Sequence, residues 1–183
     1  MTTTKKLFAL AILALMPMIQ TMAQTIEGKW KMTKESLEAI NATPDEGEAD
    51  IFLAFGQTDV KLIFQIEMSN SDVGTIGFGI ELPGEYKVEG NVINNTFNSE
   101  KATAEIFKLD LNDEIKKTLE ASEEMKALFL KTITSELDKN KPEMIEGVKM
   151  IGMGLSTLNI VKNDGTTLTL SANDKTFEMV KVE

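Results

Sequence analysis

Residues 60–68 read VKLIFQIEM, where apolar and polar side chains alternate more clearly than anywhere else in the chain. Such period-two alternation predicts an antiparallel β-strand with one face buried. The alternation resumes after an Asn-Ser-Asp turn at 70–72, and its inward residues are Ile76, Phe78, Ile80 and Leu82. Gly77 and Gly79 occupy the opposite face, where glycine indicates a bend or a close backbone approach.

Further strands are predicted on both sides of these two. Pro83-Gly84 predicts an interruption of pairing, because proline cannot donate to a strand ladder. Residues 35–57 predict a loop followed by a short helix or strand. The Asn-Asp-Gly-Thr sequence at 163–166 is a strong signal for a hairpin turn. The remaining extended segments are Ile26–Met32, 86–88, 92–97, 102–111, 158–160, 168–170 and 177–180.

A helical insertion is predicted over about residues 112–151. Asn112-Asp113 has the composition of a helix cap, and the run that follows contains neither Gly nor Pro up to Lys139. Lys141-Pro142 predicts the end of this helix and the start of a second, short one. The insertion either covers the pocket as a lid or completes the core with an apolar stripe, formed by Ile115, Leu119, Phe129, Ile133 and Leu137.

This pattern predicts a mainly β fold with one domain over residues 24–183. About eight strands follow one another in meander order, and the helical insertion precedes the last three. A closed antiparallel up-and-down barrel suits such an order, since closure removes exposed strand edges.

The first 23 residues predict a secretory signal peptide. Lys5 and Lys6 precede an apolar run of about ten residues, and Ala23 ends a small-residue cleavage site. The run is too short for a membrane span, which needs roughly 20 apolar residues. The chain contains no cysteine for lipid attachment. We therefore expect an exported protein, periplasmic or extracellular, that is soluble after cleavage and has no membrane span.

Composition argues against several functions. The formal charge of −10 becomes −12 once Lys5 and Lys6 leave with the signal peptide, and such a surface repels nucleic acid. The chain contains no Arg, His or Cys. These absences remove guanidinium clamps, imidazole acid–base catalysis and thiol nucleophiles. We expect no enzyme activity, no catalytic residues, no metal site and no cofactor.

Gly28-Lys29-Trp30, in the first predicted strand, resembles the Gly-x-Trp that opens lipocalins and the wider calycin group. The stretch Gly84–Asn91, the turn at 164–166 and the closing strand 177–181 resemble the same bacterial secreted lipocalin-like domains. Glycine permits a close turn at a barrel end, and tryptophan plugs that end. This chain lacks the arginine that commonly packs on the family's tryptophan, but the Lys181 ammonium is placed to lie over the indole.

The resemblance implies binding of a small hydrophobic molecule, of lipid or fatty-acid type, inside the barrel. An eight-stranded barrel either holds one small ligand or is filled by side chains. The alternative function is therefore a non-catalytic structural or protein-interaction module of the bacterial envelope with a packed barrel. The positions predicted to line the interior are Trp30, Val60, Leu62, Phe64, Ile66, Ile76, Phe78, Ile80, Tyr86 and Val88.

Overall fold

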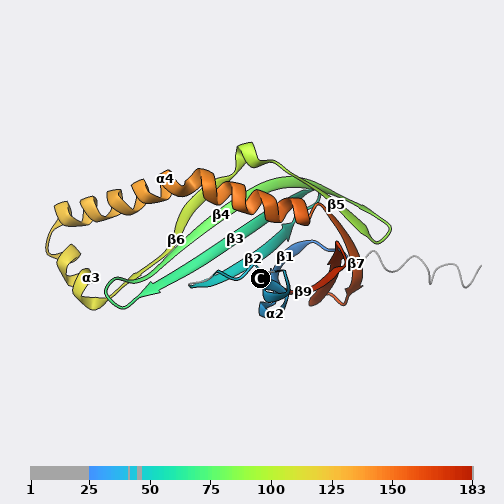
Figure 1. Ribbon diagram of the computed structural model, residues 1–183, viewed down its shortest axis with the longest axis horizontal. Helices are drawn as coiled ribbons and strands as arrows, with labels where there is room; N and C mark the ends of the chain where they lie inside the picture. Colours follow the sequence, from blue (N-terminus) through green and yellow to red (C-terminus); the bar gives the residue numbers. More distant parts are fainter. Residues whose placement is uncertain (1–24, 41, 45–46, 183) are drawn as a thin grey trace, which may run out of the picture.

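The computed structural model describes residues 25–40, 42–44 and 47–182, so the predicted signal peptide lies outside the described residues. The described chain is mainly β, with nine strands and few helices. Figure 1 shows a barrel at one end of the molecule and an arm of long strands and helix that extends from it. Among the described residues, no helix has both the length and the apolar character needed to cross a membrane.

Eight strands close into an antiparallel barrel. β1 pairs with β2 and β9, and β3 pairs with β2 and β4, so the ring has no break. This confirms the predicted up-and-down barrel. The barrel strands are β1 (Gly28–Met32), β2 (Glu48–Phe55), β3 (Asp59–Asn70), β4 (Gly74–Glu89), β5 (Val92–Phe97), β7 (Thr157–Asn163), β8 (Thr167–Ala172) and β9 (Lys175–Val182).

The ninth strand, β6 (Thr103–Leu111), lies outside the ring. It pairs with the first half of β4, from Gly74 to Glu81, whereas β5 pairs with the second half. β3 accompanies β4 along both halves. The long β3–β4 hairpin therefore projects beyond the barrel and carries β6 along one edge (Figure 1).

The predicted interruption at Pro83 is wrong. Pro83 pairs with Lys61 of β3, and β4 continues through it without a break. Proline is tolerated here because β4 changes its other neighbour from β6 to β5 at this point, so no ladder bond requires its missing N–H. The Pro83 carbonyl accepts a hydrogen bond of 2.7 Å from the Asn98 N–H.

The glycines of β4 make room for an aromatic side chain, as their position in a strand predicts. A Cβ atom on Gly77 would lie 2.7 Å from Cζ of Phe107, and one on Gly79 would lie 3.5 Å from its Cδ1. The β4–β6 register also shifts between Gly77 and Phe78, which marks a β-bulge. Phe107 thus covers the outer face of the projecting sheet.

The Gly-x-Trp segment closes one end of the barrel. Trp30 is completely buried, and its indole N–H donates a hydrogen bond of 2.7 Å to the Ile26 carbonyl. Lys181 pairs with Trp30 across β1 and β9, and its Nζ lies 5.3 Å from the centre of the Trp30 ring. The predicted lysine–indole contact is therefore confirmed. Gly28 has a φ of 122°, which only glycine adopts readily, and Lys181 fills the space above it.

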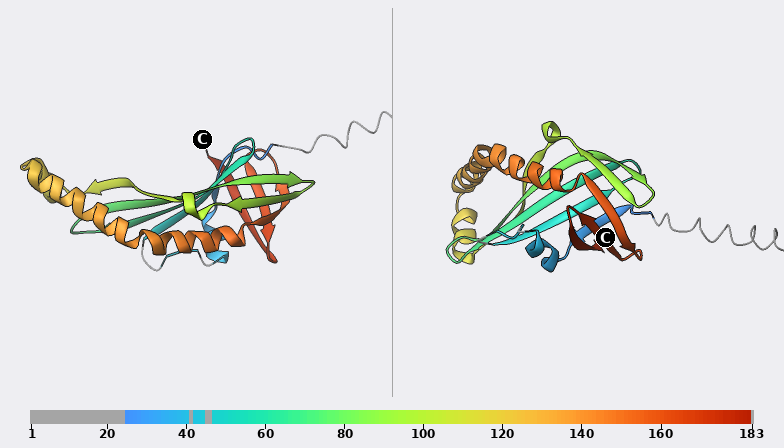
Figure 2. Two further views of the ribbon diagram at one scale, coloured as in Figure 1. Left: turned by 90° about the horizontal axis from the view of Figure 1, so that it is seen from above. Right: turned by 45° about the vertical axis from the view of Figure 1, so that its right-hand side comes forward.

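Within the described residues, four helical segments accompany the strands: α2 (Lys34–Ala39), the short 3-10 helix η2 (Ser99–Lys101), α3 (Asp113–Glu120) and α4 (Glu123–Gly154). Asn112 caps α3 as predicted, because its Oδ1 accepts a hydrogen bond of 2.9 Å from the Ile115 N–H. α4 runs along the projecting strands toward the barrel and curves on the way (Figure 2).

The predicted helix boundaries inside the insertion are wrong. The break falls at Ala121–Ser122, and α4 passes through Pro142 without interruption. Ser122 begins α4 by accepting the Met125 N–H at 3.3 Å, with Glu123 and Glu124 in the first turn. A serine cap followed by acidic residues is a helix-start signal, and here it marks the start of α4.

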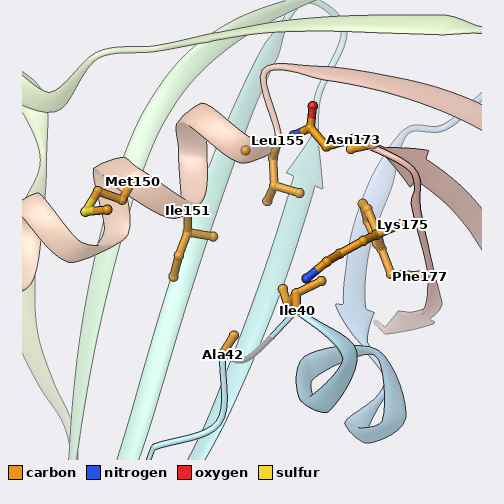
Figure 3. Close-up of a pocket in the computed structure, with 10 residues that line it drawn as sticks. Ile40, Ala42, Met150, Ile151, Leu155, Asn173, Lys175 and Phe177 are labelled. Carbon is orange, nitrogen blue, oxygen red and sulfur yellow. The ribbon is translucent and has the colours of Figure 1, made fainter.

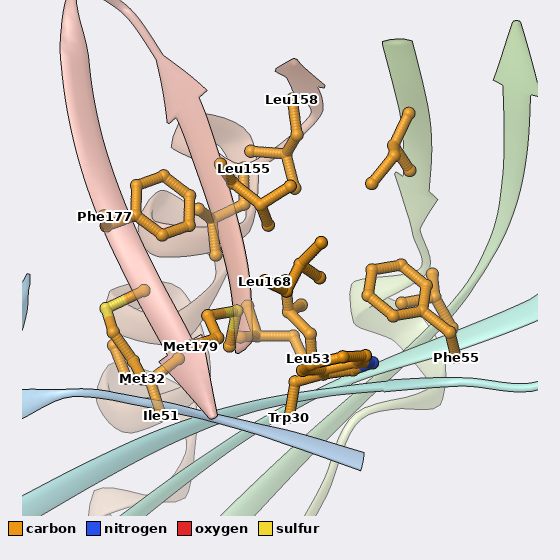
Figure 4. Close-up of a cluster of buried hydrophobic side chains, with 14 of the residues drawn as sticks. Trp30, Met32, Ile51, Leu53, Phe55, Leu155, Leu158, Leu168, Phe177 and Met179 are labelled. Atoms are coloured by element: carbon orange, nitrogen blue, oxygen red, sulfur yellow. The ribbon is translucent and has the colours of Figure 1, made fainter. Parts of the chain in front are cut away.

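The barrel interior is filled by side chains. The largest side chains there are less than 2% exposed and interdigitate from opposite walls of the barrel (Figure 4). Val148 of α4 and Leu155, the residue that caps the end of α4, complete this core. Gly152 lets the helix approach closely, since a Cβ there would lie 3.2 Å from side-chain atoms of both Leu82 and Phe97. The fully buried large residues are Trp30, Met32, Ile51, Leu53, Leu62, Ile80, Leu82, Ile93, Leu158, Leu168, Leu170 and Met179.

The predicted turn at 163–166 connects β7 and β8. Asp164 Oδ1 accepts hydrogen bonds from the backbone N–H groups of Thr166 and Thr167, at 3.1 and 2.7 Å. Its other oxygen lies 3.0 Å from the Lys162 ammonium. The backbone hydrogen bond from Thr167 and the contact with Lys162 hold the pKa of Asp164 well below its usual 3.8.

This lowered pKa predicts an acid-sensitive turn. A carboxylate with a depressed folded-state pKa stabilises the fold above its unfolded pKa, and the stabilisation is lost as pH falls through the folded value. The difference in urea midpoint between wild type and Asp164→Ala should therefore be largest near neutral pH and should shrink in acid. A difference independent of pH, or an NMR titration of the Asp164 carboxyl at or above 3.8, would contradict this.

Candidate ligand pocket at the barrel end

The ten predicted lining residues fall into three groups. The first is part of the packed interior and leaves no space there: Trp30, Val60, Leu62 and Ile80 are at most 2% exposed. Phe64 and Tyr86 pack at the margin of the same core. The second group, Ile66, Ile76 and Phe78, lies on the projecting part of β3 and β4. The third group is Val88 alone, which is 45% exposed near the end of β4.

The hydroxyl of Tyr86, one of the residues predicted to line the interior, is already hydrogen-bonded within the protein. Its O–H donates a hydrogen bond of 2.7 Å to the Gly56 carbonyl. Its ring also packs edge-on against Phe55, with centroids 5.0 Å apart. Burial, with smaller contributions from Glu27 and Asp59, raises the pKa of the Tyr86 phenol. Tyr86 therefore fastens the β2–β3 connection to β4.

The second group extends the apolar inner face of the barrel onto the arm. Ile66 lies directly opposite Phe78, and Met68 opposite Ile76, in the β3–β4 register. These side chains are half-buried or, for Met68, 45% exposed. The predicted face is therefore real, but it lies beyond the closed ring and does not line its interior.

A pocket of about 400 Å³ lies at the end of the barrel, outside the packed interior. Three elements form it: the end of α2, the last turn of α4 and the β8–β9 hairpin (Figure 3). Its volume lies in the range of small-molecule sites, about 300–1,000 Å³. The lining residues are Ile40, Ala42, Met150, Ile151, Gly154, Leu155, Ala172, Asn173, Lys175 and Phe177.

The α2 wall is tied to β9 by hydrogen bonds. The Thr33 N–H donates to the Glu178 carbonyl at 3.0 Å, and the Glu178 N–H donates to Ser36 Oγ at 2.8 Å. Thr33 also caps α2 through its hydroxyl, which is the usual use of threonine before a helix. These bonds hold Ile40, at the end of α2, against the pocket.

The α4 wall is fixed by Asn95 of β5. Its side-chain Nδ2 donates to the Leu155 carbonyl at 2.7 Å, and its backbone N–H donates to the Ser156 carbonyl at 2.7 Å. Asn95 Oδ1 is buried without a hydrogen-bond partner among the described residues. The Asn95 side chain thus satisfies the Leu155 carbonyl at the end of α4, where the helix itself supplies no donor.

The hairpin wall comes from a two-residue turn between β8 and β9. Asn173 and Asp174 both have positive φ, 49° and 63°, as a type I′ turn requires. The turn places Lys175 at the rim, where its Nζ donates to the Ala39 carbonyl at 3.1 Å. An ammonium has three donors, so the others stay available to a ligand.

The pocket thus combines apolar walls with one cation at its rim. Ile151, Leu155 and Phe177 provide apolar surface from two directions (Figure 3). Met150 is 68% exposed, and its flexible thioether suits a binding surface that adapts to its ligand. This chemistry fits an amphipathic molecule with an apolar body and an anionic head.

Other hollows also occur in the described part of the chain. One of about 600 Å³ lies between α2 and the start of β2, but two of its charged groups, Lys31 and Asp50, pair with each other at 2.6 Å. A second, of about 180 Å³, lies between the end of α4 and β5, and its Lys149 pairs with Glu146 at 3.0 Å. A third, of about 290 Å³, is an apolar groove between α3 and α4 that includes Leu128, which is 60% exposed. The first is lined by five charged residues, the second has less than half the volume of the end pocket, and the third has no charged residue in its lining.

Fold and site together define a class: a closed eight-stranded antiparallel barrel with a packed interior and an apolar pocket at one end. The chain matches no protein-family model and no curated protein.

Proposed function

We propose that this protein binds a small hydrophobic molecule with an anionic head, of fatty-acid type, in the pocket at the barrel end. The observation that carries the proposal is the combination of about 400 Å³ of mainly apolar pocket with Lys175 at its rim. The apolar chain of a ligand gains free energy as it leaves water, and the lysine attracts its carboxylate.

Other observations support a binding role. The Gly28-Lys29-Trp30 strand and the barrel resemble lipocalins, which implies a small hydrophobic ligand. Side chains fill the barrel interior. We therefore propose the end pocket as the ligand site, in place of the interior that the sequence predicts. The N-terminal 23 residues have the pattern of a signal peptide, and we propose that the protein acts outside the cytoplasm, in the periplasm or beyond.

A substitution that fills the pocket tests the site. Ala172 lines the pocket, and Ala172→Leu adds three carbon atoms to its wall. The affinity for a long-chain fatty acid should fall by about tenfold or more, which corresponds to about 1.4 kcal/mol. Ala127→Leu, on the exposed surface of α4, is the matched control and should leave the affinity unchanged. Equal affinity for all three proteins, measured by titration calorimetry, would refute the site.

A second substitution tests the recognition of the head group. Lys175→Met keeps a long apolar side chain but removes the charge. Because the lysine is solvent-exposed, we expect only a several-fold loss of affinity for a fatty acid. The affinity for the fatty alcohol of equal chain length should not change. An equal loss for both ligands would show that Lys175 does not recognise a carboxylate.

The alternative function is a non-catalytic envelope module that binds a protein partner. The packed barrel and the apolar groove between α3 and α4 favour it. On this hypothesis, a polypeptide co-purifies with the protein and is lost when Leu119, Phe129 and Ile133 are made polar. Absence of fatty-acid binding together with this co-purification would replace the first proposal by the second.

A further inference from the structure

β6 has an open edge. It pairs with β4 on one side, and no backbone hydrogen bond from its other side to the rest of the described chain is found. Seen from above, β6 forms the rim of the projecting sheet, and part of α4 comes close to it (Figure 2). A row of unpaired N–H and C=O groups is a template for pairing with another strand.

This edge is weakly protected against pairing. β6 spans nine residues without a proline, and its Lys108 ammonium is held 2.5 Å from the Glu67 carboxylate of its own chain. Proteins commonly protect such an edge with free lysines, prolines or very short strands. The protective features present on β6 are the bulge at Phe107 and the charged side chains of Glu105, Lys108 and Asp110.

The two faces of β6 follow from its register with β4. Thr103, Glu105, Lys108 and Asp110 lie opposite Glu81, Gly79, Gly77 and Thr75, on the outer face that Phe107 covers. Ala104, Ile106 and Leu109 lie opposite Ile80, Phe78 and Ile76, on the inner face. A second copy of β6 can extend the sheet only in a register that keeps outer residues opposite outer residues.

Two antiparallel registers of β6 with itself meet this condition over nearly its full length. In one, Glu105 lies opposite Asp110 of the second copy, and like charges directly opposite each other destabilise a strand pair. In the other, Glu105 lies opposite Lys108 of the second copy, and Thr103 opposite Asp110. The two-fold symmetry makes each of these pairs occur twice.

We propose that two copies of this protein pair through β6, antiparallel, in the register that sets Glu105 opposite Lys108 of the second copy. The bulged residues Ile106 and Phe107 then lie at the two-fold axis, where Ile106 of each copy faces Phe107 of the other and the match of faces is interrupted. The dimer joins the two projecting sheets into one continuous sheet. Both end pockets lie on the barrels, whereas the shared β6 edge lies on the projecting arm (Figure 1).

Disulfide trapping tests the register, because the chain has no cysteine of its own. In the proposed dimer, Thr103→Cys/Asp110→Cys places two thiols opposite each other on each side of the axis. In either single variant the two thiols lie seven residues apart, about 23 Å, which is too far for a disulfide. We expect the double variant to form a covalent dimer under mild oxidation while the single variants stay monomeric. Equal trapping in single and double variants would overturn the register.

Charge reversal tests the same interface without a covalent bond. Glu105→Lys and Lys108→Glu should each weaken the homodimer by about tenfold or more in sedimentation velocity, because like charges then face each other. A mixture of the two variants should form a heterodimer, since every facing pair is again opposite in charge. Lys162→Glu, a reversal on β7, should leave dimerisation unchanged. A monomeric wild type at high micromolar concentration, or a mixture that stays monomeric, would overturn the proposal.

Discussion

Replacing Trp30 with alanine should lower the free energy of unfolding by about 3–5 kcal/mol, the usual cost of truncating a fully buried aromatic side chain. The indole is completely buried at the end of the barrel that the Gly-x-Trp segment closes, and it lies opposite Leu53 in the β1–β2 register. Its loss opens a cavity, and it also leaves the Ile26 carbonyl without its donor. The Lys181 ammonium loses the ring that it packs against.

The measurement is urea denaturation followed by far-ultraviolet circular dichroism. Trp30 is the only tryptophan, so fluorescence cannot follow the variant. Val161→Ala, at a position of β7 that is 61% exposed, is the control and should change stability by no more than about 0.5 kcal/mol. A loss below about 1 kcal/mol for Trp30→Ala would contradict the packing described for this end of the barrel.

Two glycines of α4 should respond in opposite directions to leucine. Gly152 lies against Leu82 and Phe97, where a leucine side chain has no room, and the overpacking should cost about 1–3 kcal/mol. A Cβ atom on Gly147 would have no neighbouring side chain or strand within 4 Å. Leucine there should therefore stabilise the helix by about 0.5–1 kcal/mol. The same denaturation experiment measures both changes.

The pair separates helix propensity from packing, because both substitutions are identical and lie in one helix. If both variants gain stability, α4 does not rest closely on the barrel. If Gly152→Leu alone loses stability, the contact between α4 and the β3–β4 wall is as described. A loss at both positions would contradict the open space around Gly147.

The barrel was predictable because strand alternation is a local signal. The alternation around Val60–Met68 predicts β3, and Asp164-Gly165 predicts the β7–β8 hairpin. The extended character of residues 102–111 was also visible, but its departure from the barrel was not. That departure depends on β4 changing partners at Pro83, which involves strands distant in sequence.

The helices illustrate competition between two local signals. Lys141-Pro142 predicts a helix end, whereas Ser122-Glu123-Glu124 predicts a helix start. Packing of Val148 and Leu155 against the barrel extends α4 past the proline, since tertiary burial outweighs the cost of one lost hydrogen bond.

The pocket could not be predicted, because its residues come from three separate segments. Ile40 follows a short helix, Ile151 lies in the last turns of α4, and Lys175 follows a tight turn. The local pattern of each segment predicts a helix or a turn, and none of these patterns indicates a pocket. The sequence does place three methionines near the end of α4, Met144, Met150 and Met153, and Met150 lines the pocket.

Methyl NMR spectroscopy with a long-chain fatty acid tests the central claim most directly. Addition of the ligand should shift the methyl resonances of Ile40, Ile151 and Leu155, which line the pocket, and should leave those of Leu53 and Leu168, deep in the barrel, in place. Shifts confined to Leu53 and Leu168 would locate the ligand in the barrel interior and contradict this account. Unchanged spectra at saturating fatty acid would contradict the proposed function itself.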